Sequence, residues 1–314
     1  MKSHTEYRDD YEQYKGNGQI EFVTFHPSYA YEDFVESIRP QINKDKDKDE
    51  GDGQKFVYHD GIFKKMCLMA LKEIYKELGI NEILNSWKDF VPKRFKDALK
   101  RKIEENPNFL NSLKRYVLII DEINRGDISK IFGELITLIE DDKRLGKDND
   151  IIVKLPYSQQ FFAVPPNLYI VGTMNTADRS LTSIDIALRR RFHFEEMKPE
   201  LEELLLESES ERYNIKLDDR SAFDESINVA IHINKKLAEN PDIGRDKRIG
   251  HAFFCGIQNN QQVESAWINK IWPLLEEYYY FDKKELEILS VGAYTQSNGW
   301  DKNKFDEFIK KLKG

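Results

Sequence analysis

Residues 116–122 read Tyr-Val-Leu-Ile-Ile-Asp-Glu, an almost wholly apolar run that ends in two acids. Such a run suits a strand that is buried on both faces of a parallel sheet. We therefore predict a strand over Tyr116–Asp121 that delivers the carboxylates of Asp121 and Glu122 to its carboxyl end. In α/β sheets that end is where ligands bind.

Strands and helices alternate around this run. Further strands are predicted over 20–26, 168–174 and 192–197, with a hairpin formed by 151–155 and 160–164. Helices are predicted over 29–38 with Ser28 as N-cap, over 63–78, 129–140 and 183–190, and in the pattern that continues to residue 113. The charge-alternating run 44–54 is predicted to be a solvated loop.

After Pro199 helical periodicity dominates to the end of the sequence. Alternating strands and helices followed by helices alone predict an α/β domain over 1–199 and an α-helical domain over 200–314.

Composition narrows the class of protein. The net charge of −8 argues against wholesale electrostatic coating of DNA, although a local basic patch stays compatible with it. No apolar run is long enough to span a membrane, so no membrane contact is predicted. The two cysteines, Cys67 and Cys255, form no CxxC motif, which fits a reducing cytoplasm and argues against a disulfide scaffold or a zinc site.

The two acids of the central run suit a Walker B motif. Asp121 is the candidate ligand for Mg²⁺, usually through water, because Mg²⁺ prefers oxygen ligands and keeps part of its hydration shell. Glu122 is the candidate for polarising a water that attacks a γ-phosphate. Taken alone, the same residues also fit a buried strand that ends in a solvated acidic turn.

Polar side chains after the second apolar run extend this hypothesis. Asn175 follows the predicted strand 168–174, and its amide could bond the attacking water or the γ-phosphate. Arg189, Arg190 and Arg191 are costly to desolvate unless they meet anions. An arginine that reaches a neighbouring subunit's γ-phosphate would stabilise charge in the transition state. A satisfied turn residue and an exposed basic turn are the structural alternatives.

Two long stretches resemble one family. Residues 116–144 (YVLIIDEINRGDISKIFGELITLIEDDKR) and 165–194 (PPNLYIVGTMNTADRSLTSIDIALRRRFHF) are similar to the McrB group of AAA+ proteins, near the MoxR and dynein-related branches. Residues 23–40 resemble the strand 2 region of that family, and 248–254 and 272–282 resemble its helical lid. The resemblance implies an α/β AAA+ core of three layers with a parallel sheet, followed by an α-helical lid.

The resemblance also assigns roles to residues. It places Asp121 and Glu122 in Walker B, Asn175 at sensor 1, and Arg190 or Arg191 at the position that acts on a neighbouring subunit. Arg248 becomes a candidate sensor 2 at the start of a lid helix, with a surface arginine that caps this region as the alternative. Four flanking residues either couple subunits or are structural: Asn124, Arg125, Asp178 and Arg179.

Family members are ring motors, hexamers in the family, that use Mg²⁺ and hydrolyse GTP or ATP. The resemblance therefore implies three partners: further copies of the chain, a McrC-type endonuclease subunit, and DNA reached indirectly. The choice between GTP and ATP stays open, because the NKxD match at Asn303–Asp306 lies in a lysine-rich helical pattern and is interpreted as chance.

One departure from the family pattern is decisive for activity. The sequence holds no Gly-x-x-x-x-Gly-Lys-Ser/Thr motif, and its single Gly-Lys pair, Gly146–Lys147, is followed by Asp148. The resemblance implies a sheet of order 5-1-4-3-2, so without strand 1 the inner edges of 168–174 and 192–197 would be unpaired. We expect a chain that is truncated before or within the P-loop helix and is inactive alone. The alternatives are a non-hydrolysing ring-assembly or remnant protein, or a gap filled by another segment.

Overall fold

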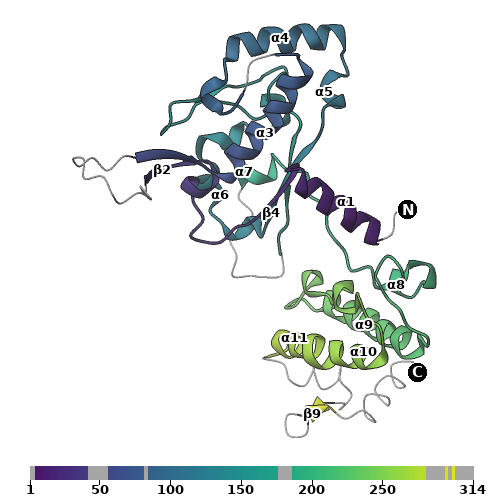
Figure 1. The fold of residues 1–314 in the computed structure, drawn as a ribbon. Helices are drawn as coiled ribbons and strands as arrows, with labels where there is room; N and C mark the ends of the chain where they lie inside the picture. Colours follow the sequence, from purple (N-terminus) through teal and green to yellow (C-terminus); the bar gives the residue numbers. More distant parts are fainter. Residues whose placement is uncertain are drawn as a thin grey trace, which may run out of the picture. The chain divides into compact units, whose positions relative to one another are not determined.

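The computed structural model describes residues 4–41, 56–80, 84–175 and 186–280, and two short strands at 294–295 and 299–300. The chain divides into two compact units (Figure 1). The first unit spans Asp10–Phe194, and the second contains Glu195–Gly314 together with the first nine residues. The predicted charged loop 44–54 lies outside the described residues.

A parallel sheet forms the centre of the first unit. Its strands are β1 (Ile20–Thr24), β4 (Tyr116–Asp121) and β7 (Leu168–Gly172), in the order β1-β4-β7. All three were predicted, and the structure confirms them. Burial along β4 alternates between full and partial, so the prediction that it is buried on both faces is wrong.

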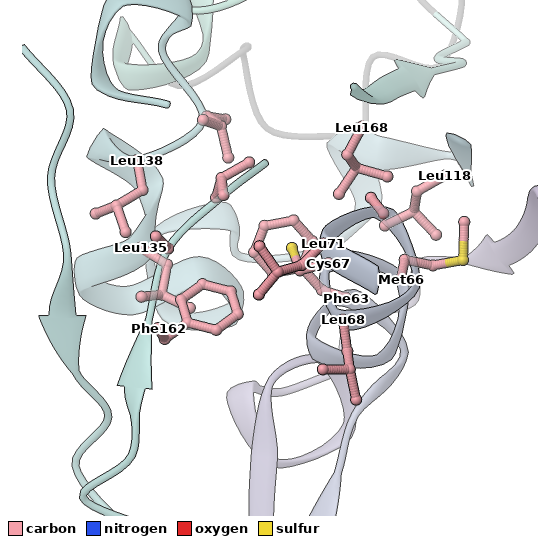
Figure 2. Packing of buried hydrophobic residues seen from close by; sticks show 14 of the residues in the cluster. Phe63, Met66, Cys67, Leu68, Leu71, Leu118, Leu135, Leu138, Phe162 and Leu168 are labelled. Carbon is pink, nitrogen blue, oxygen red and sulfur yellow. The ribbon is translucent and has the colours of Figure 1, made fainter. Parts of the chain in front are cut away.

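Helix α3 (Ile62–Glu77) covers the buried face of the sheet. Its buried apolar residues recur at helical spacing, which makes one continuous stripe and confirms the predicted helix. Figure 2 shows Met66, Cys67 and Leu71 of this helix packed among Leu118 of β4 and Leu168 of β7. The rings of Phe63 and Phe162 lie 5.9 Å apart in the same hydrophobic cluster.

Within the described part of the first unit, the other face and the β7 edge of this sheet are uncovered. Phe22, Tyr169 and Val171 on this face stay 49%, 47% and 49% exposed. As expected, β7 pairs on one side only within the described part of the chain. The predicted strand over 192–197 is wrong. These residues are irregular because no described strand lies beside them to share backbone hydrogen bonds.

The helix predicted over 29–38 is corrected as well. Only α2 (Tyr31–Phe34) is helical, with Ala30 rather than Ser28 at its N-cap. The chain then forms β2 (Glu36–Pro40), which pairs antiparallel with β3 (Phe56–Asp60). Burial of Glu36 and its bond to Lys64 of α3 oppose continuation of the helix.

The helix predicted over 129–140 breaks near its middle. Helix α6 (Ile128–Phe132) ends at Gly133, whose φ of 53° is incompatible with a right-handed helix, and the 3₁₀ helix η3 (Gly133–Thr137) follows. The predicted hairpin is confirmed in shorter form as β5 (Val153–Lys154) and β6 (Phe161–Phe162).

Further elements complete the first unit, beginning with α1, whose residues are divided between the two units. They are α1 (His4–Gly16), η1 (Trp87–Asp89), α4 (Pro92–Glu105), α5 (Phe109–Ser112), η2 (Ile123–Arg125), η4 (Asp141–Lys143) and α7 (Ile186–Arg189). The first residues of the helix predicted over 183–190 lie outside the described residues.

The second unit is helical and has its own core. Its elements are α8 (Leu201–Leu204), η5 (Glu207–Glu209), α9 (Ser221–Glu239), η6 (Arg245–Lys247), η7 (His251–Phe254), α10 (Asn260–Ala266), the π-helical turn η8 (Trp267–Ile271) and α11 (Trp272–Tyr278). Large apolar side chains from α9, η7, η8 and α11 fill this core, among them Phe223, Phe254, Trp267 and Leu275.

A short hairpin corrects the prediction of helix up to the end of the sequence. Strands β8 (Tyr294–Thr295) and β9 (Gly299–Trp300) pair antiparallel. Among the described residues, no helix combines the length and the apolar character needed to cross a membrane.

Candidate functional site at the carboxyl edge of the sheet

The parallel pairing of β4 with β7 brings the predicted residues to one edge of the sheet. Ile120 pairs with Gly172, so the residues that follow the two strands leave the sheet side by side. Asp121 is the last residue of β4 and Glu122 follows it, while Thr173 and Asn175 follow β7. The structure therefore brings both candidate acids close to the segment that carries the candidate sensor amide.

Thr173 fastens the two strand ends together. Its Oγ1 donates a hydrogen bond of 2.5 Å to Oδ1 of Asp121, and it accepts a longer contact of 3.4 Å from the backbone N–H of Glu122. Its backbone N–H donates to Ile120 and its carbonyl accepts from Ile123, both at 2.9 Å. Sequence reasoning missed Thr173; the available signal was a hydroxyl two residues before Asn175.

Glu122 is held in an unusual state. Its backbone is left-handed, with φ 53° and ψ 45°, which costs a residue with a Cβ about 1–2 kcal/mol. Its Oε2 is buried and has no hydrogen-bond partner among the described residues. Backbone strain and an unsatisfied buried oxygen in one residue are typical of a functional site.

Asn124 belongs to the same edge. Its Nδ2 donates a hydrogen bond of 3.3 Å to the backbone carbonyl of Asn175, which ties the loop after β4 to the loop after β7. Its Oδ1 is a second buried oxygen that has no partner in the described part of the chain. Arg125 is exposed at the end of η2, and the remaining flanking candidates, Asp178 and Arg179, lie outside the described residues.

The donor set at this edge fits a magnesium ion. Asp121 and Glu122 offer carboxylate oxygens, the ligands that Mg²⁺ prefers, and Oε2 of Glu122 lacks any other partner within the described ranges. The described residues contain no group of three or more His, Cys, Asp or Glu side chains that could hold a metal by themselves. A cation here would therefore share its coordination among one or two carboxylates, water and a ligand, as Mg²⁺ commonly does.

The three consecutive arginines separate into two environments. Arg189 and Arg190 are exposed, whereas the side chain of Arg191 is 3% exposed. The Nε of Arg191 lies 2.9 Å from Oε1 of Glu140 within the same unit. This ion pair holds Arg191 within its own unit, whereas Arg189 and Arg190 stay exposed.

Arg248 lies in the second unit and is engaged there. Its Nη2 donates to Oε1 of Glu196 at 3.0 Å and its Nε donates to the carbonyl of Arg245 at 2.7 Å. It adopts an extended conformation after η6 rather than starting a helix. Next to Arg248, the side-chain amide of Asn234 on α9 donates to the carbonyl of Ile249 and accepts from its backbone N–H. These two bonds hold the segment around Ile249 against α9.

Comparison with known proteins gives two family matches and two relatives. The AAA domain (dynein-related subfamily) matches residues 11–192, and the McrB alpha-helical lid domain matches residues 225–287. The Type IV methyl-directed restriction enzyme EcoKMcrB subunit of Escherichia coli (strain K12) is 34% identical over 284 residues, which are 85% of this chain and 49% of that protein. The Type II restriction enzyme BsuMI component YdiS of Bacillus subtilis (strain 168) is 23% identical over 284 residues, 87% of this chain and 74% of that protein.

The chain thus spans about half the length of the E. coli protein. The two family matches agree with the two units of the structure. The AAA match covers the unit with the parallel sheet, and the lid match covers most of the described helical unit. With an α/β core, acids at the carboxyl edge of its sheet and a helical lid, the chain belongs to the McrB-type AAA+ proteins of the dynein-related subfamily.

Proposed function

We propose that this chain is the nucleotide-hydrolysing module of a restriction motor that uses GTP or ATP with Mg²⁺. One observation carries the proposal: Oε2 of Glu122 is buried and unsatisfied at the sheet edge, beside an aspartate that a threonine holds in place. Asp121 would hold Mg²⁺, which supplies charge neutralisation on the phosphates. Glu122 would take the proton of the attacking water, and Asn175 would orient that water.

Charge on the transferred phosphoryl group needs cations in addition to Mg²⁺. Arg190, exposed beside the buried Arg191, would act on the nucleotide of a neighbouring copy, which requires a ring of subunits. Arg248 of the lid would bind phosphate after leaving Glu196. In this scheme the core ends near residue 199 and the lid follows it.

The relatives' names support a role in restriction, because one is a subunit of a methyl-directed restriction enzyme and the other a component of a restriction enzyme. We infer that the module works in the cytoplasm, where DNA lies, with a McrC-type endonuclease subunit that cuts the DNA. DNA recognition itself is indirect in this scheme.

Residues 1–314 contain no Gly-x-x-x-x-Gly-Lys-Ser/Thr motif, and in P-loop NTPases that loop cradles the phosphates. We therefore propose that residues 1–314 by themselves hydrolyse neither GTP nor ATP. The same observation favours a second candidate function, a non-hydrolysing assembly module that keeps the subunit interface alone.

The test is to purify the tagged chain from its source cells together with its partners and to measure phosphate release from GTP and from ATP. We expect Mg²⁺-dependent release by the complex, a loss of about 100-fold or more with Glu122→Gln, and none from residues 1–314 alone. Glu104→Gln, an exposed acid on α4, is the matched control and should change nothing.

Phosphate release that Glu122→Gln leaves intact would refute the proposed role of this site. A complex that assembles but hydrolyses neither nucleotide would support the assembly module instead. Clear Mg²⁺-dependent turnover by residues 1–314 alone would refute the proposed inactivity.

A further inference from the structure

Helix α4 concentrates positive charge in an otherwise acidic chain. Its sequence is PKRFKDALKRKIEE, and residues 92–102 contain six cations and one acid, although the whole chain has a net charge of −8. The cations are Lys93, Arg94, Lys96, Lys100, Arg101 and Lys102. No step of the nucleotide chemistry proposed above uses this helix.

The apolar face of α4 fixes the direction in which its charges point. Phe95 and Leu99 are buried, and the ring of Phe95 stacks on Tyr75 of α3 at 5.3 Å. Leu99 packs so closely against Gly146 that a Cβ added to this glycine would lie 2.8 Å from it. Because these contacts set the rotation of the helix, the opposite face stays in solvent along the outside of the first unit (Figure 1).

That outer face carries a row of exposed cations. Lys93, Arg94, Lys100 and Arg101 are all exposed and, at spacings of seven residues, fall on one side of the helix. One exposed acid, Asp97, lies among them, and the exposed acids Glu104 and Glu105 follow at the end of the helix. Inward of this row, Lys96 is paired with Asp150 at 2.6 Å.

The exposed lysines of the row lack acidic partners. Across the described ranges, neither Lys93 nor Lys100 makes an ion pair. The four cations outnumber the single acid, Asp97, that lies among them, and a bound polyanion would balance the excess positive charge.

We propose that the outer face of α4, defined by Lys93, Arg94, Lys100 and Arg101, binds the phosphate backbone of duplex DNA without sequence preference. Lys93 and Lys100 are about 10 Å apart along the helix axis. Duplex DNA carries one charge per about 1.7 Å of its own axis, so the row meets phosphates in any register.

The chemistry of this face also selects how it binds DNA. Within α4 the exposed side chains are charged, and none is an aromatic ring that could stack on a base or an amide that could read a base edge. Contacts to phosphate alone position DNA without reading its sequence. The inference is independent of nucleotide hydrolysis, and its test contains no nucleotide.

The test measures binding of the full chain to a short labelled duplex by fluorescence anisotropy between about 50 mM and about 200 mM salt. The variant Lys93→Gln/Lys100→Gln removes two of the exposed charges. We expect the slope of log K against log salt to fall by about 1.8 and binding at about 50 mM salt to weaken about tenfold or more. Because both side chains are exposed, the thermal unfolding midpoint should not change.

The matched control is Lys235→Gln/Lys236→Gln, which removes two exposed lysines from α9 of the lid. It should bind DNA like the unmodified chain. Equal losses in both double variants would reduce the effect to net charge and overturn the proposal, as would absence of DNA binding by the unmodified chain at the lowest salt. A third outcome is that polyglutamate binds the chain, DNA does not bind, and only the α4 variant loses affinity for polyglutamate. This result would assign the face to an acidic protein and would also overturn the proposal.

Discussion

Two glutamates of the first unit carry buried carboxylate oxygens in opposite circumstances. Glu36 accepts from Nζ of Lys64 at 2.8 Å and from the backbone N–H groups of Tyr157 and Ser158 at 3.0 Å each. Lys64, itself fully buried, also pairs with Asp60 at 2.7 Å. Glu122 has a buried oxygen without any described partner and a backbone in the left-handed region.

This difference indicates a structural role for Glu36 and a functional role for Glu122. A buried charge is tolerated when its atoms are paired and hydrogen-bonded, and both oxygens of Glu36 have donors in the Glu36–Lys64–Asp60 cluster, which ties the β2–β3 hairpin to α3. A buried oxygen without a donor raises the energy of the fold, and a bound cation or hydrogen-bond donor would lower it. The stability of the fold should therefore depend on Glu36 and hardly at all on Glu122.

The largest expected effect on stability comes from Lys64→Met. It leaves Glu36 buried without its cation, and breaking such a pair costs about 3–5 kcal/mol of unfolding free energy. Denaturant unfolding of the full chain measures this loss. The neighbouring Lys65 is exposed on the same helix, so Lys65→Met should stay within about 0.5 kcal/mol of the unmodified chain. Equal losses of unfolding free energy in the two variants would show that the ion pair of Lys64 with Glu36 is not what stabilises the fold.

Thr173→Val should have the next largest effect. It removes the hydroxyl that bonds Asp121 while keeping the shape of the side chain, and a hydrogen bond to a charged group contributes about 1.5–3 kcal/mol. Urea unfolding should show this loss, and turnover by the purified complex should fall through kcat more than through KM. Thr173→Ser restores the hydroxyl and should recover both. A variant Thr173→Ser as impaired as Thr173→Val would show that the methyl group, and not the bond, matters.

Lowering the pH should reduce the stabilising contribution of the Glu36–Lys64–Asp60 cluster. Burial opposes the ionisation of Glu36, but hydrogen bonds from Lys64 and Ser158 outweigh it and hold the pKa of this carboxyl below its ordinary value. The unfolded chain therefore binds the proton more readily, so this contribution is full above about pH 4.3 and is lost as pH falls through the lower pKa of the folded state. Unfolding free energies measured from neutral pH downward should fall less steeply for Glu36→Gln than for the unmodified chain. An identical slope would contradict this assignment.

The smallest expected effect is that of Glu122→Gln on stability. Removing a charge whose oxygen has no donor should change the unfolding free energy by no more than about 0.5 kcal/mol. Glu122→Gly should raise stability by up to about 1 kcal/mol, because glycine adopts the left-handed conformation without strain. A loss above about 1 kcal/mol in either variant would make Glu122 a structural residue.

The sequence predicted the parts of the fold that depend on local pattern. The apolar runs that became β4 and β7 and the apolar stripe of α3 lie in contiguous segments, and all three were located correctly. The edge where Asp121 and Glu122 emerge followed from the same pattern, because a parallel sheet places the ends of neighbouring strands together.

What sequence reasoning missed depends on partners far along the chain. The helix expected over 29–38 ends early because Glu36 bonds Lys64, 28 residues away. Arg191 looked equivalent to Arg190 until its ion pair with Glu140 placed it inside the fold. Thr173 gained its role only from the pairing of two strands. The break at Gly133 is the exception, since the glycine itself was visible in the sequence.

One partly buried arginine helps to hold the open edge of the sheet. Arg144 donates from Nε and Nη2 to the carbonyl of Ile139 and from Nη1 to that of Leu168, where β7 begins. A shift of β7 by a single residue along β4 would break this contact and turn Leu168 toward solvent. Lysine could not replace this arginine, because one ammonium cannot match a planar fork that serves two separate carbonyls. Arg144 at the start of β7 and Thr173 after its end thus both oppose sliding of the edge strand, which lets β7 keep its alignment although nothing described flanks its far side.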